Sequence, residues 1–100
     1  MTGELLWLDL EMTGLDPGYH DIVEIATVIT DARLEVITEG PDLVVHTHEG
    51  RLERMGDYVH EMHQRSGLLD EIRASELTLT EAEEHTLGFI DSHLPQDYRP

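Results

Sequence analysis

One run of eleven residues decides how the rest of this sequence is interpreted: Trp7-Leu8-Asp9-Leu10-Glu11-Met12-Thr13-Gly14-Leu15-Asp16-Pro17. Its first half continues an apolar segment that begins at Leu5, and Gly14 and Pro17 follow, which is the pattern of a buried strand that runs into a turn. Alternate residues of a strand project from the same face. Asp9 and Glu11 are therefore expected to share one face, with their Cα atoms roughly 7 Å apart.

The acidic pair Asp9 and Glu11 indicates a metal site. Two carboxylates side by side in an apolar setting repel each other and lose hydration, so a proton, a basic partner or a metal ion must compensate. Carboxylate oxygens suit hard divalent cations such as Mg²⁺ or Mn²⁺, and such a pair can help to hold two ions about 3.5–4 Å apart, as in two-metal phosphoryl-transfer sites. The alternative is a solvated strand end, which is disfavoured because acids are poor strand formers.

Length and composition indicate a single domain over residues 1–100 with a modest core. The absence of cysteine excludes a disulfide framework and a thiolate zinc site. No apolar run approaches the roughly 20 residues of a membrane span, and the first four residues lack the basic region of a signal peptide. We therefore expect a soluble cytoplasmic protein without membrane partners.

The net charge of −16, with six arginines and no lysine, limits the ligands that the chain can bind. Proteins that grip long nucleic acid usually present a basic face, because phosphate contacts supply much of the affinity. A protein of this composition that binds phosphate groups would need metal ions to neutralise them, and it would suit short ligands rather than long duplexes. The alternative cause of the charge is a generally acidic, solvated surface.

The first half of the chain predicts three strands. They cover residues 5–11, residues 22–30, which are rich in β-branched side chains, and residues 34–39. Asp31-Ala32 is a connection of hairpin length, and residues 40–42 break or bulge the third strand before residues 43–46 resume extended structure. Residues 16–21 form a turn, in which Asp16 is expected to hydrogen-bond to the backbone of the turn itself. The connections are too short for parallel crossovers, so the strands form an antiparallel meander.

The second half predicts helices. Residues 50–56 form a short helix with Leu52 and Met55 inward, residues 57–65 are helical or irregular, and Ser66 resembles the N-cap of the next helix. Thr80-Glu81-Ala82-Glu83 fits a capping box, and an amphipathic helix follows that ends before Pro95. Strands followed by helices favour the α/β class in an α+β arrangement, with helices packed on a twisted sheet.

Residues 9–16, Asp9-Leu10-Glu11-Met12-Thr13-Gly14-Leu15-Asp16, resemble the first motif of the DEDD 3′→5′ exonucleases. Met12 and the later segments Ile22-Val23-Glu24-Ile25-Ala26, Ser66-Gly67-Leu68 and Ala74-Ser75 narrow the resemblance to the oligoribonuclease family, over residues 5 to about 94. The resemblance implies a ribonuclease-H-like exonuclease fold, of which this chain would be the N-terminal part, with the domain continuing past residue 100.

The resemblance also implies a function and roles for particular residues. The function is 3′→5′ hydrolysis of short single-stranded RNA, dinucleotides above all, by a homodimer that holds two Mg²⁺ or Mn²⁺ ions. Asp9 would ligate both ions and Glu11 one. The backbone after Glu11 would hold the terminal 3′-hydroxyl, and Leu15 and Tyr58 would clamp the bases, although the family often has Trp at the latter position. The substrate-binding residues would be Met12, Thr13, Gly14, Leu15, Tyr58 and His63.

Three residues keep alternative interpretations. Leu15 would wedge against a base or else pack in the core. Glu24, between two apolar residues of the second strand, would orient Thr13 or a nearby amide, or else be a partly exposed surface acid. His63 would contact substrate or else lie on a helix surface. Zinc at His46-x-His48 is disfavoured because neither histidine has an evident third ligand. His60 and His63 do not form a zinc-protease motif, because they are three positions apart and not four.

The remaining acids and the histidine base of the DEDD site are not evident in the sequence. We therefore expect the 100-residue chain alone to be inactive. The rival hypothesis is a non-catalytic module of the same fold that binds a metal ion or a partner protein.

Overall fold

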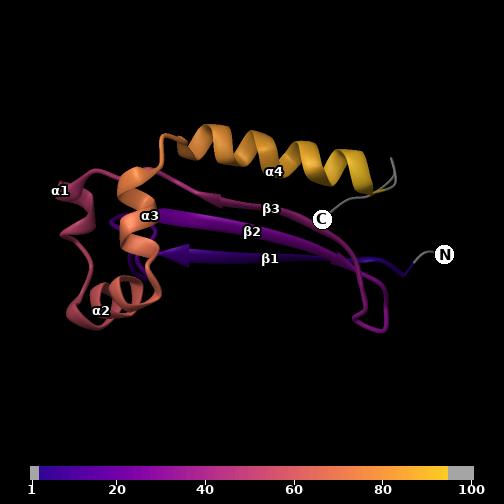
Figure 1. The fold of residues 1–100 in the computed structure, drawn as a ribbon, viewed down its shortest axis with the longest axis horizontal. Coiled ribbons are helices and arrows are strands. Elements are labelled where there is room, and N and C mark those ends of the chain that lie inside the picture. Colours follow the sequence, from indigo (N-terminus) through magenta and orange to yellow (C-terminus); the bar gives the residue numbers. More distant parts are fainter. Residues whose placement is uncertain (1–2, 95–100) are drawn as a thin grey trace.

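The computed structural model describes residues 3–94, and these form a three-stranded antiparallel sheet followed by four helices (Figure 1). The strands are β1 (Leu5–Met12), β2 (Ile22–Thr30) and β3 (Val36–Val44), in the spatial order β1-β2-β3. The helices are α1 (Glu49–Leu52), α2 (Asp57–Ser66), α3 (Leu68–Ala74) and α4 (Leu79–His93). The meander of strands followed by helices is therefore confirmed. No helix within the described range is long and apolar enough to cross a membrane.

Strand β2 forms the centre of the sheet and supplies its best buried residues. Val23, Ile25, Thr27 and Ile29 alternate with half-buried neighbours, as expected for a strand with one face in the core. Strand β1 lies at one edge, where its apolar side chains remain accessible, with Leu8 51% and Leu10 38% exposed. The prediction of a buried first strand is thus wrong for the described residues, because no further strand or helix there covers this edge.

The β2–β3 connection is longer than predicted. The side chain of Asp31 accepts hydrogen bonds from the amides of Arg33 and Glu35, and Leu34 adopts a left-handed conformation with φ of 68°. Leu34 therefore belongs to the turn and not to the third strand. Asp31 stabilises this turn through local side-chain to backbone bonds, which a count of connecting residues does not reveal.

Strand β3 continues through the predicted break as a bulge. Ala26 pairs with Asp42 and Val28 pairs with Glu39, so Thr27 alone faces the two residues Gly40 and Pro41. A Cβ atom at Gly40 would overlap the Thr27 hydroxyl and lie 2.7 Å from the Phe89 ring. Glycine at this position therefore allows α4 to approach the sheet closely.

Two apolar clusters hold the helices to the sheet. One cluster joins β2 to α1, α2 and α3 and comprises Val23, Leu52, Met55, Leu68, Leu69 and Ile72. The other lies where α4 packs along β2 and β3, and comprises Ile25, Val45 and Ala82 (Figure 1). Leu52 and Met55 are buried as predicted. Helices α1, α2 and α3 lie at the end of the sheet where β1 ends (Figure 1).

Two predicted helix starts are wrong. The capping box of α4 is formed by Thr78 and Glu81, two residues before the predicted pair, and the hydrogen bonds to Thr78 hold the pKa of Glu81 below its usual value. Ser66 is the last residue of α2 and not the N-cap of α3. Gly67, which has a left-handed backbone conformation, lies between the two helices. The Ser66 hydroxyl still accepts a hydrogen bond from the amide of Leu68.

Candidate active site

Asp9 and Glu11 lie on one face of the sheet together with acids from the two neighbouring strands. Asp9 is opposite Ala26, which is opposite Asp42, and Glu11 is opposite Glu24. Directly paired residues of antiparallel strands project from the same face. The predicted same-face placement of Asp9 and Glu11 is therefore confirmed, and the pairing adds Glu24 and Asp42 to that face.

These carboxyl groups influence one another electrostatically. A hydrogen bond with Asp42, partial burial and the nearby charges of Asp42, Glu11 and Glu71 together raise the pKa of Glu24 to about 7. Like charges and burial both favour the protonated form of a carboxyl group. Close to neutral pH, Glu24 can therefore carry a proton and donate a hydrogen bond to Asp42.

The partner of Glu24 differs from the predicted one. Asp42 is the residue that raises the pKa of Glu24 most, whereas Thr13 is fully buried and bonded to Asp21. The Thr13 amide donates to the Asp21 carbonyl and the Thr13 hydroxyl accepts from the Asp21 amide, both at 2.9 Å. The prediction that Glu24 orients Thr13 is wrong, because Thr13 is already fixed at the other end of the turn. The Thr13 amide is likewise engaged, so it cannot also hold a ligand hydroxyl.

His63 is buried beneath the end of β1. Its side chain is 2% exposed, and its Nε2 lies 2.8 Å from the carbonyl oxygen of Met12, to which it donates. The alternative that His63 lies on a helix surface is therefore wrong. His63 also lines a shallow cavity of about 290 Å³ that is shared by Glu11, Glu24, Met62, Ser66, Leu68 and Glu71. The cavity brings a helix α2 side chain beside the acidic face of the sheet.

The two residues predicted to clamp bases are the most exposed large apolar side chains at this end of the molecule. Leu15 is 95% exposed in the turn after β1, and Tyr58 is 80% exposed in the first turn of α2. Tyr58 lines a shallow hollow of about 270 Å³ with Glu61, Met62, Arg65 and Ser66. Both side chains are therefore free to contact a ligand, and neither contributes to the core.

The turn between Leu15 and Ile22 is held by its own polar groups. The Asp16 carbonyl accepts from the amides of Tyr19 and His20, and the Asp16 side chain accepts from the Gly18 amide at 3.0 Å. The prediction that Asp16 bonds its own turn is confirmed. Gly14 lies against the His20 ring, because a Cβ atom there would be 2.5 Å from Nδ1 and Nε2 of His20.

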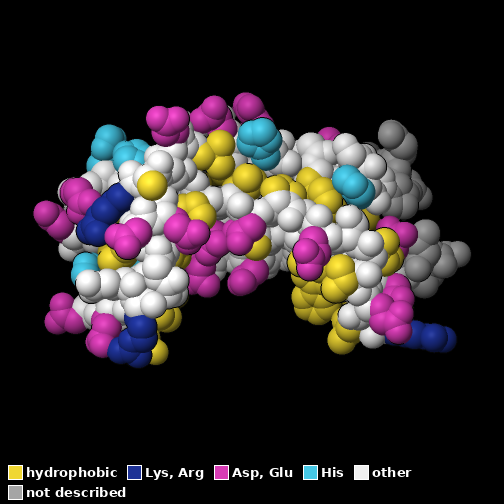
Figure 2. All heavy atoms as spheres, in the orientation of Figure 1, with side chains coloured by type: hydrophobic (Ala, Val, Ile, Leu, Met, Phe, Trp, Pro, Cys, Tyr) yellow, Lys and Arg dark blue, Asp and Glu magenta, His cyan; other side chains and the backbone are white. Residues whose placement is uncertain are grey.

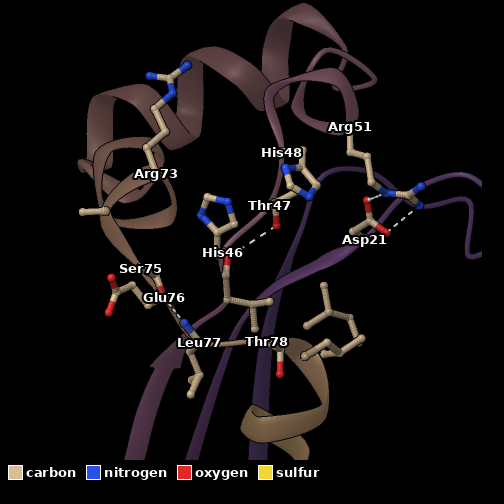
Figure 3. A pocket seen from close by; sticks show the side chains of 14 residues that line it. Asp21, His46, Thr47, His48, Arg51, Arg73, Ser75, Glu76, Leu77 and Thr78 are labelled. Carbon is tan, nitrogen blue, oxygen red and sulfur yellow. Dashed lines mark hydrogen bonds and ion pairs between the residues drawn. The ribbon is translucent and has the colours of Figure 1, made fainter.

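Another cavity lies apart from the acidic pair. It has a volume of about 570 Å³ and is lined by residues of the β3–α1 and α3–α4 connections (Figure 3). The rings of His46 and His48 stand 5.5 Å apart between Arg73 and the Arg51–Asp21 ion pair. Both arginines are engaged by carboxylates, since Arg73 bonds Glu49. This cavity contains neither Asp9 nor Glu11.

The acidic face offers oxygen donors that fit a divalent cation. The three ion pairs found in residues 3–94 involve Asp21, Glu61 and Glu49, so none of them neutralises Asp9 or Glu11. The raised pKa of Glu24 reflects the same excess of negative charge. Within residues 3–94 no three acids or histidines converge on one point, so Asp9 and Glu11 would supply only part of a coordination shell.

Comparison with known proteins agrees with this arrangement. The chain matches a protein family described as Exonuclease (RNase_T) over residues 6–99. It is 49% identical to an oligoribonuclease of Mycobacterium avium over 94 residues, which are 94% of this chain and 44% of that protein. It is 54% identical to one from Corynebacterium glutamicum over 89 residues (89% and 41%), and 45% identical to one from Photobacterium profundum over 96 residues (96% and 53%). The chain spans about half the length of these relatives.

Proposed function

This chain belongs to the RNase_T family of exonucleases, and we propose that it carries the Asp9–Glu11 part of the active site of a 3′→5′ exoribonuclease. The proposed substrates are short single-stranded oligoribonucleotides, dinucleotides above all, which are degraded to mononucleotides. The three relatives described above are named oligoribonucleases, and their similarity covers nearly all of this chain. The observation that carries the proposal is the placement of Asp9 and Glu11 on one face of β1, directly before the exposed Leu15.

Exonucleases of this family use divalent metal ions, and we propose Mg²⁺ or Mn²⁺ at Asp9 and Glu11. When bound, such ions supply charge neutralisation at the scissile phosphate and a water of lowered pKa. Asp9 and Glu11 would hold the cations, and these two residues share one face of the sheet near the end of β1. Glu24 lies opposite Glu11, and because its pKa is raised to about 7 it adds less than a full negative charge beside Glu11 near neutral pH.

The apolar residues at the same end give the site its preference for short RNA. Leu15 and Tyr58 present exposed side chains against which bases can stack or wedge, and stacking of one base on an aromatic ring is worth about 1–3 kcal/mol. Their contact with bases does not depend on base identity. His63 fixes the Met12 carbonyl, so it supports the substrate-binding backbone from beneath.

The charge distribution also supports short substrates. Acidic side chains are spread over the visible face of the molecule, and basic side chains appear at only a few places (Figure 2). Three of the five arginines in residues 3–94 are paired with carboxylates. Few cations therefore remain to follow a long phosphate backbone, and long duplexes are not expected to bind. We further propose, from the family resemblance, that the complete protein acts as a homodimer.

The test of the proposed function is hydrolysis by the complete gene product. It is incubated with Mn²⁺ and a labelled diribonucleotide, beside the Asp9→Ala variant and a matched Asp91→Ala variant on the exposed side of α4. We expect mononucleotide release that is lost in Asp9→Ala and retained in Asp91→Ala. Binding of Mn²⁺ without release of mononucleotides would favour the non-catalytic module instead.

A further inference from the structure

His20 bridges two segments that carry the proposed base clamp. Its Nδ1 lies 3.1 Å from the backbone nitrogen of Asp16, the residue after Leu15. Its Nε2 lies 3.0 Å from the carbonyl oxygen of Arg54, four residues before Tyr58. One imidazole ring thus connects the turn after β1 to the segment that leads into α2.

The two partners determine the protonation of the ring. The Asp16 amide can only donate, so Nδ1 must accept, whereas the Arg54 carbonyl can only accept, so Nε2 must carry the proton. The bridge therefore uses a neutral imidazole with one tautomer. Both hydrogen-bonding positions of the ring are occupied by backbone groups, so His20 itself is not available to a ligand or a metal ion.

Further contacts between the same two segments support the bridge. The Arg54 guanidinium donates to the Tyr19 carbonyl at 3.2 Å and stands over the Tyr19 ring, 4.8 Å from its centroid. The guanidinium of Arg51 binds the Asp21 carboxylate with two hydrogen bonds of 2.6 and 2.8 Å, which hold the pKa of Asp21 below its usual value. Gly14 allows the His20 ring to lie directly against the turn.

The segment on the helical side is itself rigid. Met55, the residue after Arg54, is buried in the cluster that joins β2 to α1, α2 and α3. Helix α2 starts at Asp57, so Tyr58 is fixed relative to Met55 by one short connection. On the other side, only the peptide bond between Leu15 and Asp16 separates the exposed leucine from the bridged amide. The position of Leu15 relative to Tyr58 therefore depends on the His20 bridge together with the arginine contacts beside it.

We propose that His20 is a positioning residue that fixes the spacing of Leu15 and Tyr58 by bridging the Asp16 amide and the Arg54 carbonyl. This inference rests on the proposed function, because it assigns to that spacing the selection of RNA two nucleotides long. A fixed spacing favours a substrate whose two bases fill the clamp, whereas a variable spacing removes this advantage. His20 does not touch the substrate in this proposal, and it acts only through the two backbone segments.

The first experiment measures the spacing itself in the 100-residue chain. The chain contains no cysteine, so spin labels at Leu15→Cys and Tyr58→Cys are site-specific, and pulsed electron resonance gives the distribution of distances between them. We expect a narrow distribution with His20 and a distribution at least twice as wide in His20→Ala. His20→Asn keeps an acceptor near the Asp16 amide but is too short to reach Arg54, so it should preserve the turn and still widen the distribution.

Two controls separate positioning from general loss of stability. His85→Asn changes an exposed histidine on α4, and Ile25→Val lowers stability through the cluster beneath α4 without touching the bridge. Both should leave the distribution narrow. An unchanged distribution in both His20→Ala and His20→Asn would overturn the proposal.

The second experiment measures turnover by the complete gene product. We expect His20→Asn to raise KM for a diribonucleotide about tenfold, because binding must then order a clamp that is no longer held in place beforehand. We expect kcat to change less than twofold and KM for a pentanucleotide to change little. An equal rise in KM for both substrates, or a fall in kcat alone, would contradict the role of His20 in fixing the spacing. If the unmodified protein does not cleave dinucleotides, the proposed function fails, and the distance measurement still decides whether His20 fixes the two segments.

Discussion

Glu11 and Glu24 stand directly opposite each other on β1 and β2, so the proposed metal-binding carboxylate has a second carboxyl group as its cross-strand neighbour. Like charges in this position destabilise a sheet unless one of them is neutralised. Here the hydrogen bond with Asp42, together with burial and the surrounding acids, raises the pKa of Glu24 to about 7. The proton on Glu24 therefore relieves the repulsion on the face that carries Asp9 and Glu11.

The first prediction concerns the pH dependence of stability without added metal. The pKa of Glu24 rises from the ordinary glutamate value of 4.5 to about 7 on folding, so the folded chain retains a proton that the unfolded chain releases. The contribution of Glu24 to stability is therefore greatest below pH 4.5 and is lost as the pH rises to 7. Because the group is partly solvated, we expect this loss to be on the order of 1 kcal/mol.

The variant Glu24→Gln tests this prediction. Glutamine cannot ionise. In urea unfolding between pH 5 and 8, the free energy of unfolding of Glu24→Gln should therefore fall less with rising pH than that of the unmodified chain, and it should be higher at pH 8. Glu84→Gln, on the exposed side of α4, serves as the matched control and should keep the original decline. A decline of equal slope in Glu24→Gln would show that Glu24 is not the titrating group.

The second prediction concerns metal binding by the 100-residue chain. Calorimetric titration with Mn²⁺ should show weak binding, because Asp9 and Glu11 supply only part of a coordination shell. Asp9→Asn should remove the heat of binding, whereas Asp91→Asn should leave it unchanged. An unchanged titration for Asp9→Asn would place the cation elsewhere on this acidic surface.

The third prediction separates stacking from base readout in the complete gene product. Tyr58→Ala should lower kcat/KM for all sixteen dinucleotides by similar factors, about tenfold, because every base presents a π face. Tyr58→Phe, which keeps the ring, should retain most of the activity. A loss confined to dinucleotides with one particular base would instead indicate hydrogen bonding by the tyrosine hydroxyl.

The elements and the acidic pair could be predicted because they depend on local periodicity. Strand β2 spans Ile22–Thr30 as predicted, since its residues, most of them β-branched, alternate between half-buried and buried positions. Asp9 and Glu11 share a face for the same reason, because the side-chain period of a strand is two. These properties need no knowledge of distant residues.

The features that prediction missed depend on distant partners. The bond between His20 and the Arg54 carbonyl spans 34 positions of the sequence, and Glu24 meets Asp42 only because a bulge shifts β3. Thr78 and Thr80 each precede a glutamate by three residues, so both fit a capping box. Helix α4 begins after Thr78. The Ser75 hydroxyl donates to the Val44 carbonyl at 2.6 Å and accepts from the Leu77 amide at 3.1 Å, and these bonds fix the chain directly before Thr78.

The last prediction concerns two threonines of β2 whose hydroxyl groups differ in their partners. Within residues 3–94 the buried Thr27 hydroxyl, beside Gly40, has no hydrogen-bond partner, whereas the Thr30 hydroxyl accepts from the Trp7 indole at 2.9 Å and donates to the Asp31 carbonyl at 3.0 Å. A buried hydroxyl without a partner costs about 1–3 kcal/mol, and valine has nearly the same shape without the hydroxyl. Thr27→Val should therefore raise the free energy of unfolding by about 1 kcal/mol, while Thr30→Val should lower it by a similar amount. Urea unfolding at constant pH measures both changes, and because the two substitutions are chemically identical, any intrinsic preference of valine for strands cancels in their difference. If Thr27→Val destabilised the chain as much as Thr30→Val, the Thr27 hydroxyl would have to be hydrogen-bonded in solution.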